Sequence, residues 1–278
     1  MSSVFIVFLI SAVFLPFLVE EVEAFLSTLA KETLQTLPPN REMEFGVHGE
    51  LKEGGATYID SHCHLHFNDN EPPPGHGVQV CPMSVDEEDW ERVVHYRKLN
   101  PSSVYSFGFG VHPWYTDGIS DHWLDKLEEK LLEYPDAIVG EIGLDRAKSI
   151  DRRAGEWAGQ VRCFEAQMRL AARLGRPASV HCVRAWGALA DTLRALAREG
   201  GARGAGLPPA VAIHSYTGSA EFAQSLLSIP ELKDRIYFGF SHLVNARNPK
   251  NIPKLVGVLA ALPEDRLLLE SDAEGEEG

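Results

Sequence analysis

Eight short runs rich in β-branched and aromatic residues recur along the chain from residue 57 onward, and most are followed by a stretch with helical spacing of its apolar residues. The runs are 57–61, 78–81, 104–111, 137–142, 178–181, 211–214, 236–240 and 267–271. Strands that alternate with helices are typical of a parallel sheet, and eight such units predict a closed (β/α)₈ barrel. The expected fold class is therefore α/β, and the expected architecture is a TIM barrel.

The helical patterns between the runs lie at 87–99, 122–134, 155–174, 185–199, 220–227 and 249–262. Asp121 is placed to cap the second of them, and Gly175 with Pro177 is a stop signal for the third. No sequence repeat of roughly 20 to 50 residues is apparent, which argues against a solenoid. We therefore expect most strands to be joined to the next by an outer helix.

The first part of the chain, residues 1–45, is an apolar segment followed by a linker, and we expect the barrel domain to occupy residues 46–278. The run 4–19 is almost wholly apolar, as in a secretory signal or a membrane anchor. No Lys or Arg precedes it, and Glu20 and Glu21 follow it, so a helix packed on the barrel is the other interpretation. That second interpretation predicts a cytoplasmic protein, whereas the first predicts the secretory pathway or membrane contact.

Charge and cysteine content argue against some classes of protein. The chain has 26 Lys and Arg against 40 Asp and Glu, a formal net charge of −14. Such a chain is not expected to coat duplex DNA, although bound cations could supply positive charge at one point. The four cysteines lie far apart and form no CxxC pair, so neither a disulfide framework nor a structural zinc site is predicted.

The active site of such a barrel lies where the strands end on their C-terminal side, so polar residues at those ends are the candidates. The first run leads into Asp60, His62 and His64, which share one face because alternate residues of a strand do. The two histidines can hold one cation, and Asp60 is expected to accept a ring N–H from one of them. His66 follows where the chain should already turn, and it is interpreted as a loop residue.

Carboxylates end two further strands. Glu141 is flanked by apolar residues, and a buried carboxylate needs a cation beside it, which a glutamate can share between two ions. Asp145 has two interpretations. It is a residue of the site, or it caps a helix or forms an ion pair with Arg146. Asp272 ends the last run, where it can bind the first cation and take a proton from water, and Glu270 is expected to support the site or lie at the core edge.

Single histidines, His181 and His214, end the fifth and sixth runs, each after apolar residues and at the same level of the barrel. One such histidine alone would more often be a satisfied core or loop residue. Two on neighbouring strands, added to the first histidine pair and to Glu141, predict a second cation position.

The strand ends carry six motifs in order. They are Asp-Ser-His-Cys-His-Leu at 60–65, Gly-Val-His-Pro at 110–113, Gly-Glu-Ile-Gly-Leu-Asp at 140–145, the histidine at 181, His-x-x-x-Gly at 214–218 and Leu-Leu-Glu-Ser-Asp at 268–272. This series resembles the TatD-related metal-dependent hydrolases of the amidohydrolase superfamily, over about residues 57–272. The resemblance implies a divalent-metal deoxyribonuclease or phosphodiesterase.

The same resemblance implies a site with two divalent ions, of Mg, Mn or Zn. By it, one ion would be held by His62, His64 and Asp272, the other by His181 and His214, and both by Glu141. The two ions would activate water for attack on a DNA end or another phosphodiester, with Asp272 as the proton acceptor and Glu141 as the second catalytic residue. His112 would face the substrate phosphate, or would be a loop histidine held by Pro113.

The chain also departs from the pattern of this family, whose members usually continue into a further helix after the last strand. We therefore expect a barrel without its last C-terminal helix, with the apolar N-terminal segment as a substitute helix.

Two other functions stay open. One is an amidohydrolase acting on a C–N bond, although Glu141 stands where such an enzyme could carry a carbamylated lysine. The other is a catalytically weak barrel that serves as a binding partner.

Overall fold

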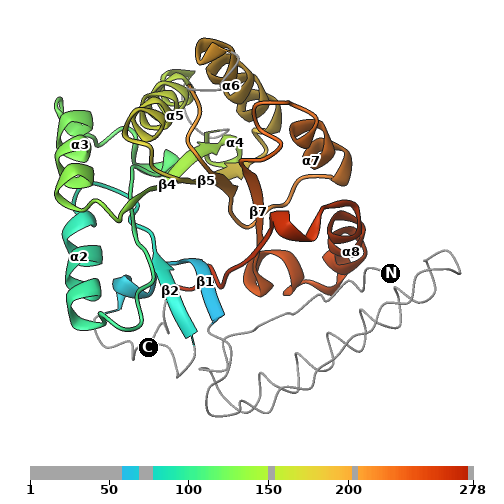
Figure 1. Ribbon diagram of the computed structural model, residues 1–278, viewed down its shortest axis with the longest axis horizontal. Helices are drawn as coiled ribbons and strands as arrows, with labels where there is room; N and C mark the ends of the chain where they lie inside the picture. The colour runs from blue at the N-terminus through green and yellow to red at the C-terminus, as the bar shows by residue number, and fades with distance from the viewer. Residues whose placement is uncertain (1–57, 69–77, 150–153, 202–205, 275–278) are drawn as a thin grey trace, which may run out of the picture.

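Parallel strands form the inner wall of the computed structural model, which Figure 1 shows nearly end-on. The structure describes residues 58–68, 78–149, 154–201 and 206–274. The strands are β1 (Tyr58–Cys63), β2 (Val78–Pro82), β3 (Gly108–Phe109), β4 (Ile138–Asp145), β5 (Ala178–Val183), β6 (Val211–Ile213), β7 (Ile236–Phe240) and β8 (Leu267–Leu269). The predicted α/β class and TIM-barrel architecture are confirmed.

Hydrogen bonds close the ring at the two places where continuous strand pairing stops. β3 to β8 follow one another in a six-stranded sheet, and β1 pairs with β2 in a second sheet. An isolated parallel bridge between Met83 and Gly108 joins β2 to β3. At the other seam, the Asp272 N–H donates to the His62 carbonyl at 3.0 Å. This second seam already brings the end of β8 against the histidines of β1.

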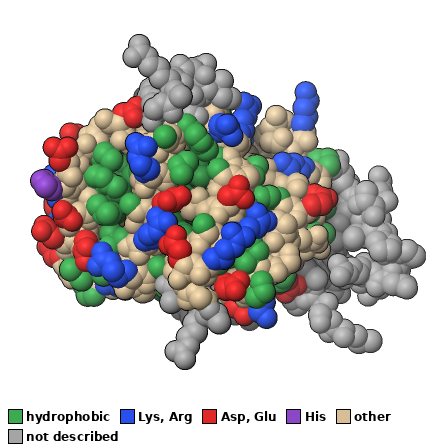
Figure 2. Space-filling view, turned by 90° about the horizontal axis from the view of Figure 1, so that it is seen from above, with side chains coloured by type: hydrophobic (Ala, Val, Ile, Leu, Met, Phe, Trp, Pro, Cys, Tyr) green, Lys and Arg blue, Asp and Glu red, His purple; other side chains and the backbone are tan. Residues whose placement is uncertain are grey.

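Helices pack around the outside of the ring (Figure 1). They are α2 (Trp90–Leu99), α3 (Trp123–Glu133), α4 (Arg146–Ser149), α5 (Ala154–Leu174), α6 (Trp186–Glu199), α7 (Ala220–Leu227) and α8 (Ile252–Ala261). Shorter helical turns are η1 (Leu65–Phe67), η2 (Pro113–Tyr115), η4 (His242–Ala246), η5 (Pro249–Asn251) and η6 (Glu264–Arg266). On the face shown in Figure 2, Lys and Arg side chains are interspersed with Asp and Glu rather than gathered into one band.

The core between strands and helices follows from the apolar spacing of the sequence. Leu189, Leu193 and Leu196 recur along α6 at helical spacing and are completely buried. They belong to the same cluster of buried side chains as Val180 of β5 and Ile213 of β6. Burying each leucine contributes roughly 1.5–3 kcal/mol, so this helix face holds the strands that lead into the fifth and sixth strand ends.

Most predicted elements lie where expected, with shifted ends. The runs 236–240 and 220–227 are β7 and α7 without change. Gly175 has a φ of +65° directly after α5, a conformation that glycine adopts without strain, so the predicted stop is confirmed. The predicted cap was wrong, because α3 begins after His122, which makes no side-chain cap hydrogen bond, and Asp121 lies one residue too early.

The third strand is much shorter than its predicted run. Val104 forms only an isolated bridge with Val80, and β3 covers two residues. The backbone then passes so close to β4 that a Cβ on Gly110 would lie 2.7 Å from the Glu141 carbonyl oxygen. Only glycine permits this approach, and it leaves His112 at the mouth of the barrel.

Some predictions fall on residues outside the described ranges. These are the apolar segment and linker at 1–45 and the missing helix beyond the last strand. Within the described parts of the chain, no helix is both long enough and apolar enough to cross a membrane. The four cysteines, Cys63, Cys81, Cys163 and Cys182, are free and buried, in agreement with the predicted lack of disulfides.

Candidate metal centre

The side chains predicted as a metal site converge at the C-terminal mouth of the barrel. They come from β1, β4 and β5 and from the residues after β6 and β8, and they are His62, His64, Glu141, His181, His214 and Asp272. Potential ligand atoms form three overlapping groups within 4.8 Å: His62 with His64 and Asp272, His62 with Glu141 and His214, and His112 with Glu141 and His181. The structure therefore brings the whole predicted set together and adds His112 to it.

Glu141 lies at the centre of the cluster, with one carboxylate oxygen toward each histidine pair. Its Oε2 is 3.4 Å from His62 Nε2 and 3.2 Å from His64 Nε2. Its Oε1 is 3.1 Å from His181 Nδ1 and 2.7 Å from His214 Nε2. Burial by itself would raise the pKa of this carboxyl, but the neighbouring histidines outweigh burial and hold the pKa well below its usual range. Glu141 is thus a buried anion between two sets of ring nitrogens.

The first histidine pair is held with both Nε2 atoms toward the site. His64 donates its Nδ1 proton to the Met83 carbonyl at 2.8 Å, so its Nε2 carries the lone pair when the ring is neutral. His62 Nδ1 is 2.9 Å from the Ser179 hydroxyl. The two Nε2 atoms lie 3.3 Å apart. Two imidazole nitrogens bound to one tetrahedral ion at about 2.1 Å would be separated by about 3.4 Å, so this pair fits a divalent cation.

Asp272 completes the first group from the β8 side of the seam between β8 and β1. Its Oδ1 lies 3.9 Å from the Nε2 atoms of His62 and His64. Its Oδ2 accepts a hydrogen bond from the Ser215 hydroxyl at 3.3 Å. Asp272 and Ser215 both have positive φ, +55° and +41°, and such strain in residues other than glycine clusters at functional sites. One oxygen of Asp272 thus stays directed at the histidine pair.

The second histidine pair has the same spacing with a different anchor. His214 Nε2 and His181 Nδ1 are 3.3 Å apart. His181 is turned so that its Nε2 faces Asp145 Oδ2 at 3.3 Å, which leaves Nδ1 for the site. His214 Nδ1 is buried without a hydrogen bond, 3.7 Å from Glu270 Oε1. Burial opposes a charged His214 ring, but Glu141 outweighs burial and raises its pKa well above the usual value.

His112 faces the cluster as a hydrogen-bond donor. Its Nδ1 accepts the Trp114 backbone N–H at 3.2 Å, so the proton of the neutral ring is on Nε2, which lies 3.3 Å from Glu141 Oε1. Burial lowers the pKa of His112 to about 4. A neutral ring that donates through Nε2 is suited to a substrate oxygen rather than to a cation. His112 thus lies in the loop before η2, as one interpretation had it, and its ring faces the cluster.

The prediction for Asp60 was wrong in its detail. Asp60 accepts backbone N–H groups from His62 at 3.2 Å and from Ser271 at 2.9 Å, together with the Ser271 hydroxyl, and it accepts no ring N–H in any of these bonds. It therefore ties β1 to β8. The ring partners come from β5 and from the residue after β2, and nothing in the sequence around His62 indicates them.

Three other acidic or histidine residues have definite partners in the structure. Asp145, whose role the sequence left open, faces His181 and also accepts the Trp114 indole N–H at 2.6 Å. Glu270 accepts the Ser215 backbone N–H, in line with a supporting role. His66 lies in η1, where it is buried and hydrogen-bonded to Asp89 at 2.9 Å. The predicted turn at His66 is therefore present, and the His66 ring is fixed in it by Asp89.

Comparison with known proteins gives a consistent result. A family model described as "TatD related DNase" matches residues 59–273. The Cut9-interacting protein scn1 of Schizosaccharomyces pombe is 27% identical over 298 residues, which cover 78% of this chain and 86% of that protein. The 3'-5' ssDNA/RNA exonuclease TatD of Edwardsiella piscicida is 33% identical, over 66% of this chain and 62% of that protein.

Solved structures agree in fold. YJJV, a TatD homolog from Escherichia coli k12, has a TM-score of 0.60 and 25% identity, and the match covers 77% of this chain and 78% of that one. A hydrolase TatD family protein from Entamoeba histolytica also has a TM-score of 0.60, with 19% identity, over 78% of this chain and 74% of that one. The second match, at its lower identity, supports the barrel fold alone.

Proposed function

The chain belongs to the family of TatD-related DNases, and from this we propose that it is a divalent-metal-dependent phosphodiesterase that cleaves DNA with a metal-activated water. The observation that carries the proposal is the position of Glu141, whose two oxygens face two histidine pairs with the same 3.3 Å nitrogen separation. A bridging carboxylate between two such pairs is suited to two cations.

The proposed ligands follow from which ring nitrogens face Glu141. We assign His62, His64 and Asp272 to one ion, His181 and His214 to the other, and Glu141 to both. Imidazole nitrogens suit Zn, whereas carboxylates suit Mg and Mn, so the mixed donor set is compatible with all three metals. Bound divalent ions polarise a phosphodiester oxygen and lower the pKa of a bound water.

Asp272 is the proposed proton acceptor. Its side chain is 17% exposed, against 4% for Glu141, so it can meet a water molecule that enters the mouth of the barrel. Ser215 occupies one of its oxygens and leaves the other directed at the first histidine pair. Glu141, surrounded by five histidine rings, is better placed to fix the cations than to move protons.

No covalent intermediate is proposed, because the cysteines are unsuited to attack. Burial raises the pKa of the Cys182 and Cys163 thiols to about 12, so they are not ionised at neutral pH. His112 is neutral at that pH, and its Nε2–H is proposed to donate to a phosphate oxygen. In this proposal His112 would bind and orient the phosphate, Asp272 would accept a proton from water, and the cations would supply the positive charge.

The preferred substrate is proposed to be a short or single-stranded end rather than a coated duplex. The net charge of −14 and the interspersed charges of Figure 2 provide no continuous basic band on the face shown. Long duplexes are bound mainly through many Lys and Arg contacts to phosphates. One of the similar proteins is named a 3'-5' ssDNA/RNA exonuclease, in agreement with this substrate class.

A second candidate function is a barrel that binds another protein. It is favoured by one observation, the name of scn1 as a Cut9-interacting protein. A folded, metal-loaded chain that cleaves no phosphodiester would favour this candidate over the nuclease.

The test is a nuclease assay on single-stranded DNA with Mg, Mn or Zn, comparing the parent chain with Glu141→Ala and Asp272→Ala. Losing several kcal/mol of transition-state stabilisation corresponds to a rate loss of roughly a thousandfold in each variant. The matched control is Glu129→Ala, an exposed carboxylate on α3, which should cleave at the parent rate. Full activity in Glu141→Ala would refute the assignment of the site.

A further inference from the structure

Two large aromatic side chains lie exposed beside the metal centre. Trp114 is 45% exposed and Tyr115 is 42% exposed, and they are consecutive residues of η2, the turn that follows β3. Because η2 follows a barrel strand, it lies at the same end of the barrel as the cluster around Glu141. Single exposed aromatic residues are common, but an adjacent pair next to a candidate active site is a feature that needs an explanation.

The Trp114 ring is fixed against the site at one edge. Its indole N–H donates to Asp145 Oδ2 at 2.6 Å, and Asp145 in turn faces the ring of His181. The Trp114 ring centre is 5.1 Å from that of His112 and 6.4 Å from that of His181. The hydrogen bond of the indole N–H to Asp145 restricts rotation of the ring. Since 45% of Trp114 is exposed, the ring offers solvent a pre-oriented aromatic surface.

Tyr115, the next residue of η2, is also close to His112. Its ring centre lies 6.2 Å from that of His112, at an interplanar angle of 57°. Both exposed rings therefore lie near His112, the residue proposed to donate to the phosphate. A nucleotide whose phosphate meets His112 would bring a neighbouring base within reach of one of them.

We propose that Trp114 and Tyr115 form a stacking platform for an unpaired nucleobase next to the scissile phosphate. This inference rests on the proposed function and specifies its substrate class, a single-stranded nucleic acid or a frayed end of any sequence. Aromatic stacking tolerates every base because each base has a π face. It also gives a chain with net charge −14 a source of affinity that does not depend on Lys and Arg contacts.

The platform can be tested by binding, without cleavage. The full-length Glu141→Gln chain, with Mg added, is titrated against a fluorescent oligothymidylate and against a strand of equal length that lacks bases, and anisotropy gives the two Kd values. We expect the strand without bases to bind roughly tenfold more weakly, near the lower part of the range for base–aromatic stacking. Adding Trp114→Ala should weaken binding of oligothymidylate by a similar factor and leave binding of the strand without bases unchanged.

Two further variants separate stacking from other roles. Trp114→Phe keeps an aromatic face but loses the N–H that Asp145 accepts, so it should bind oligothymidylate nearly as the Glu141→Gln chain does. Tyr105→Ala is the matched control, because Tyr105 is also an exposed aromatic residue, at 60%, but lies before β3, whereas Trp114 follows that strand, at the end where the site lies. It should change neither Kd.

The platform is refuted if Trp114→Ala weakens both strands equally or neither of them. The binding measurement tests the platform separately from the proposed nuclease activity, because it requires no cleavage. A parent chain that cleaves no strand with Mg, Mn or Zn, while its binding still depends on bases and on Trp114, would overturn the proposed function and support the platform. Cleavage at equal KM by the parent chain and by Trp114→Ala would overturn the platform alone.

Discussion

Replacing Asp145 with asparagine removes the negative charge that orients His181. In the structure, Asp145 Oδ2 lies 2.6 Å from the Trp114 indole nitrogen and 3.3 Å from His181 Nε2. An asparagine oxygen can still accept the shorter bond, but it no longer attracts the Nε2 proton of His181, and its amide group can donate to Nε2 instead. The ring would then carry its proton on Nδ1, the atom 3.1 Å from Glu141, where the second cation is proposed to bind.

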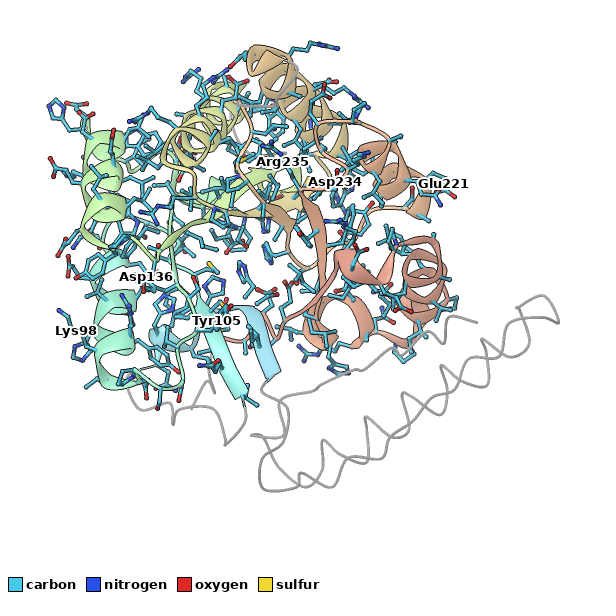
Figure 3. All side chains as sticks on the ribbon, viewed as in Figure 1. Lys98, Tyr105, Asp136, Glu221, Asp234 and Arg235 are labelled. Atoms are coloured by element: carbon cyan, nitrogen blue, oxygen red, sulfur yellow. The ribbon has the colours of Figure 1, made fainter. Side chains whose placement is uncertain are left out.

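The expected loss is confined to one of the two proposed cation sites. Removing the partner that orients a histidine ligand costs about 10–100-fold in metal affinity, which corresponds to about 1.4–2.7 kcal/mol. Calorimetric titration of the metal-free chain with Zn or Mn should show one binding event weakened by this factor in Asp145→Asn, while the event assigned to His62 and His64 keeps its affinity. Asp136→Asn, an exposed carboxylate that pairs with Arg97 on the outer surface, is the matched control (Figure 3).

Unchanged affinity at both sites would refute the argument that Asp145 selects the His181 tautomer. Equal weakening of both events would refute it too, since Asp145 lies beside the second histidine pair only. A measurement of the midpoint of thermal unfolding, Tm, without metal guards against a folding defect, and Asp145→Asn should lie near the parent value.

Three other predictions concern metal binding, the packing of α6 and an ionisable group outside the site. Saturating the chain with Mn or Zn should raise Tm, because metal at a hundred times its Kd adds about 2.7 kcal/mol to the free energy of unfolding. Addition of a chelator should reverse the rise. A Tm that does not change with metal would contradict a site formed only in the folded state. Leu193→Ala should lower the free energy of unfolding by about 2–5 kcal/mol in urea, because Leu193 is completely buried in α6. Burial opposes ionisation of Glu87, but hydrogen bonds from Ser120 outweigh it and lower its pKa below 4.5, so its stabilisation is present above that pH and lost as the pH falls further. Glu87→Gln should therefore narrow the difference between urea midpoints at neutral and acidic pH, and an unaltered difference would count against this contact.

Local patterns were sufficient for most of the elements that carry the site. Alternation in β1 correctly put His62 and His64 on one face, and apolar spacing correctly located α6 and α7. The failures were of a different kind. The third run was predicted as a long strand because its residues have strand character, whereas in the structure Val104 forms only an isolated bridge and β3 covers two residues.

The partners of the site residues were harder to predict than the residues themselves. The sequence around His64 contains no sign that its Nδ1 proton goes to the Met83 carbonyl, and Asp60 was assigned to a histidine ring although it binds Ser271 across the seam. For Asp145 a local signal existed, because it ends β4 in the same motif as Glu141. That signal could not separate a histidine partner from a helix cap, since both lie within reach of a strand end.

The sequence alone determined the kind of side chain at each strand end and the order of the strands, because both depend on residues close together in the chain. Only the tertiary structure decided which ring nitrogen of each histidine faces the centre, since its partner comes from another strand. It also decided that the end of β8 meets β1, which brings Asp272 to histidines more than 200 positions earlier. Closure of the ring depends on contacts between residues far apart in the chain, so the local sequence of neither β1 nor β8 contains the site that forms where they meet.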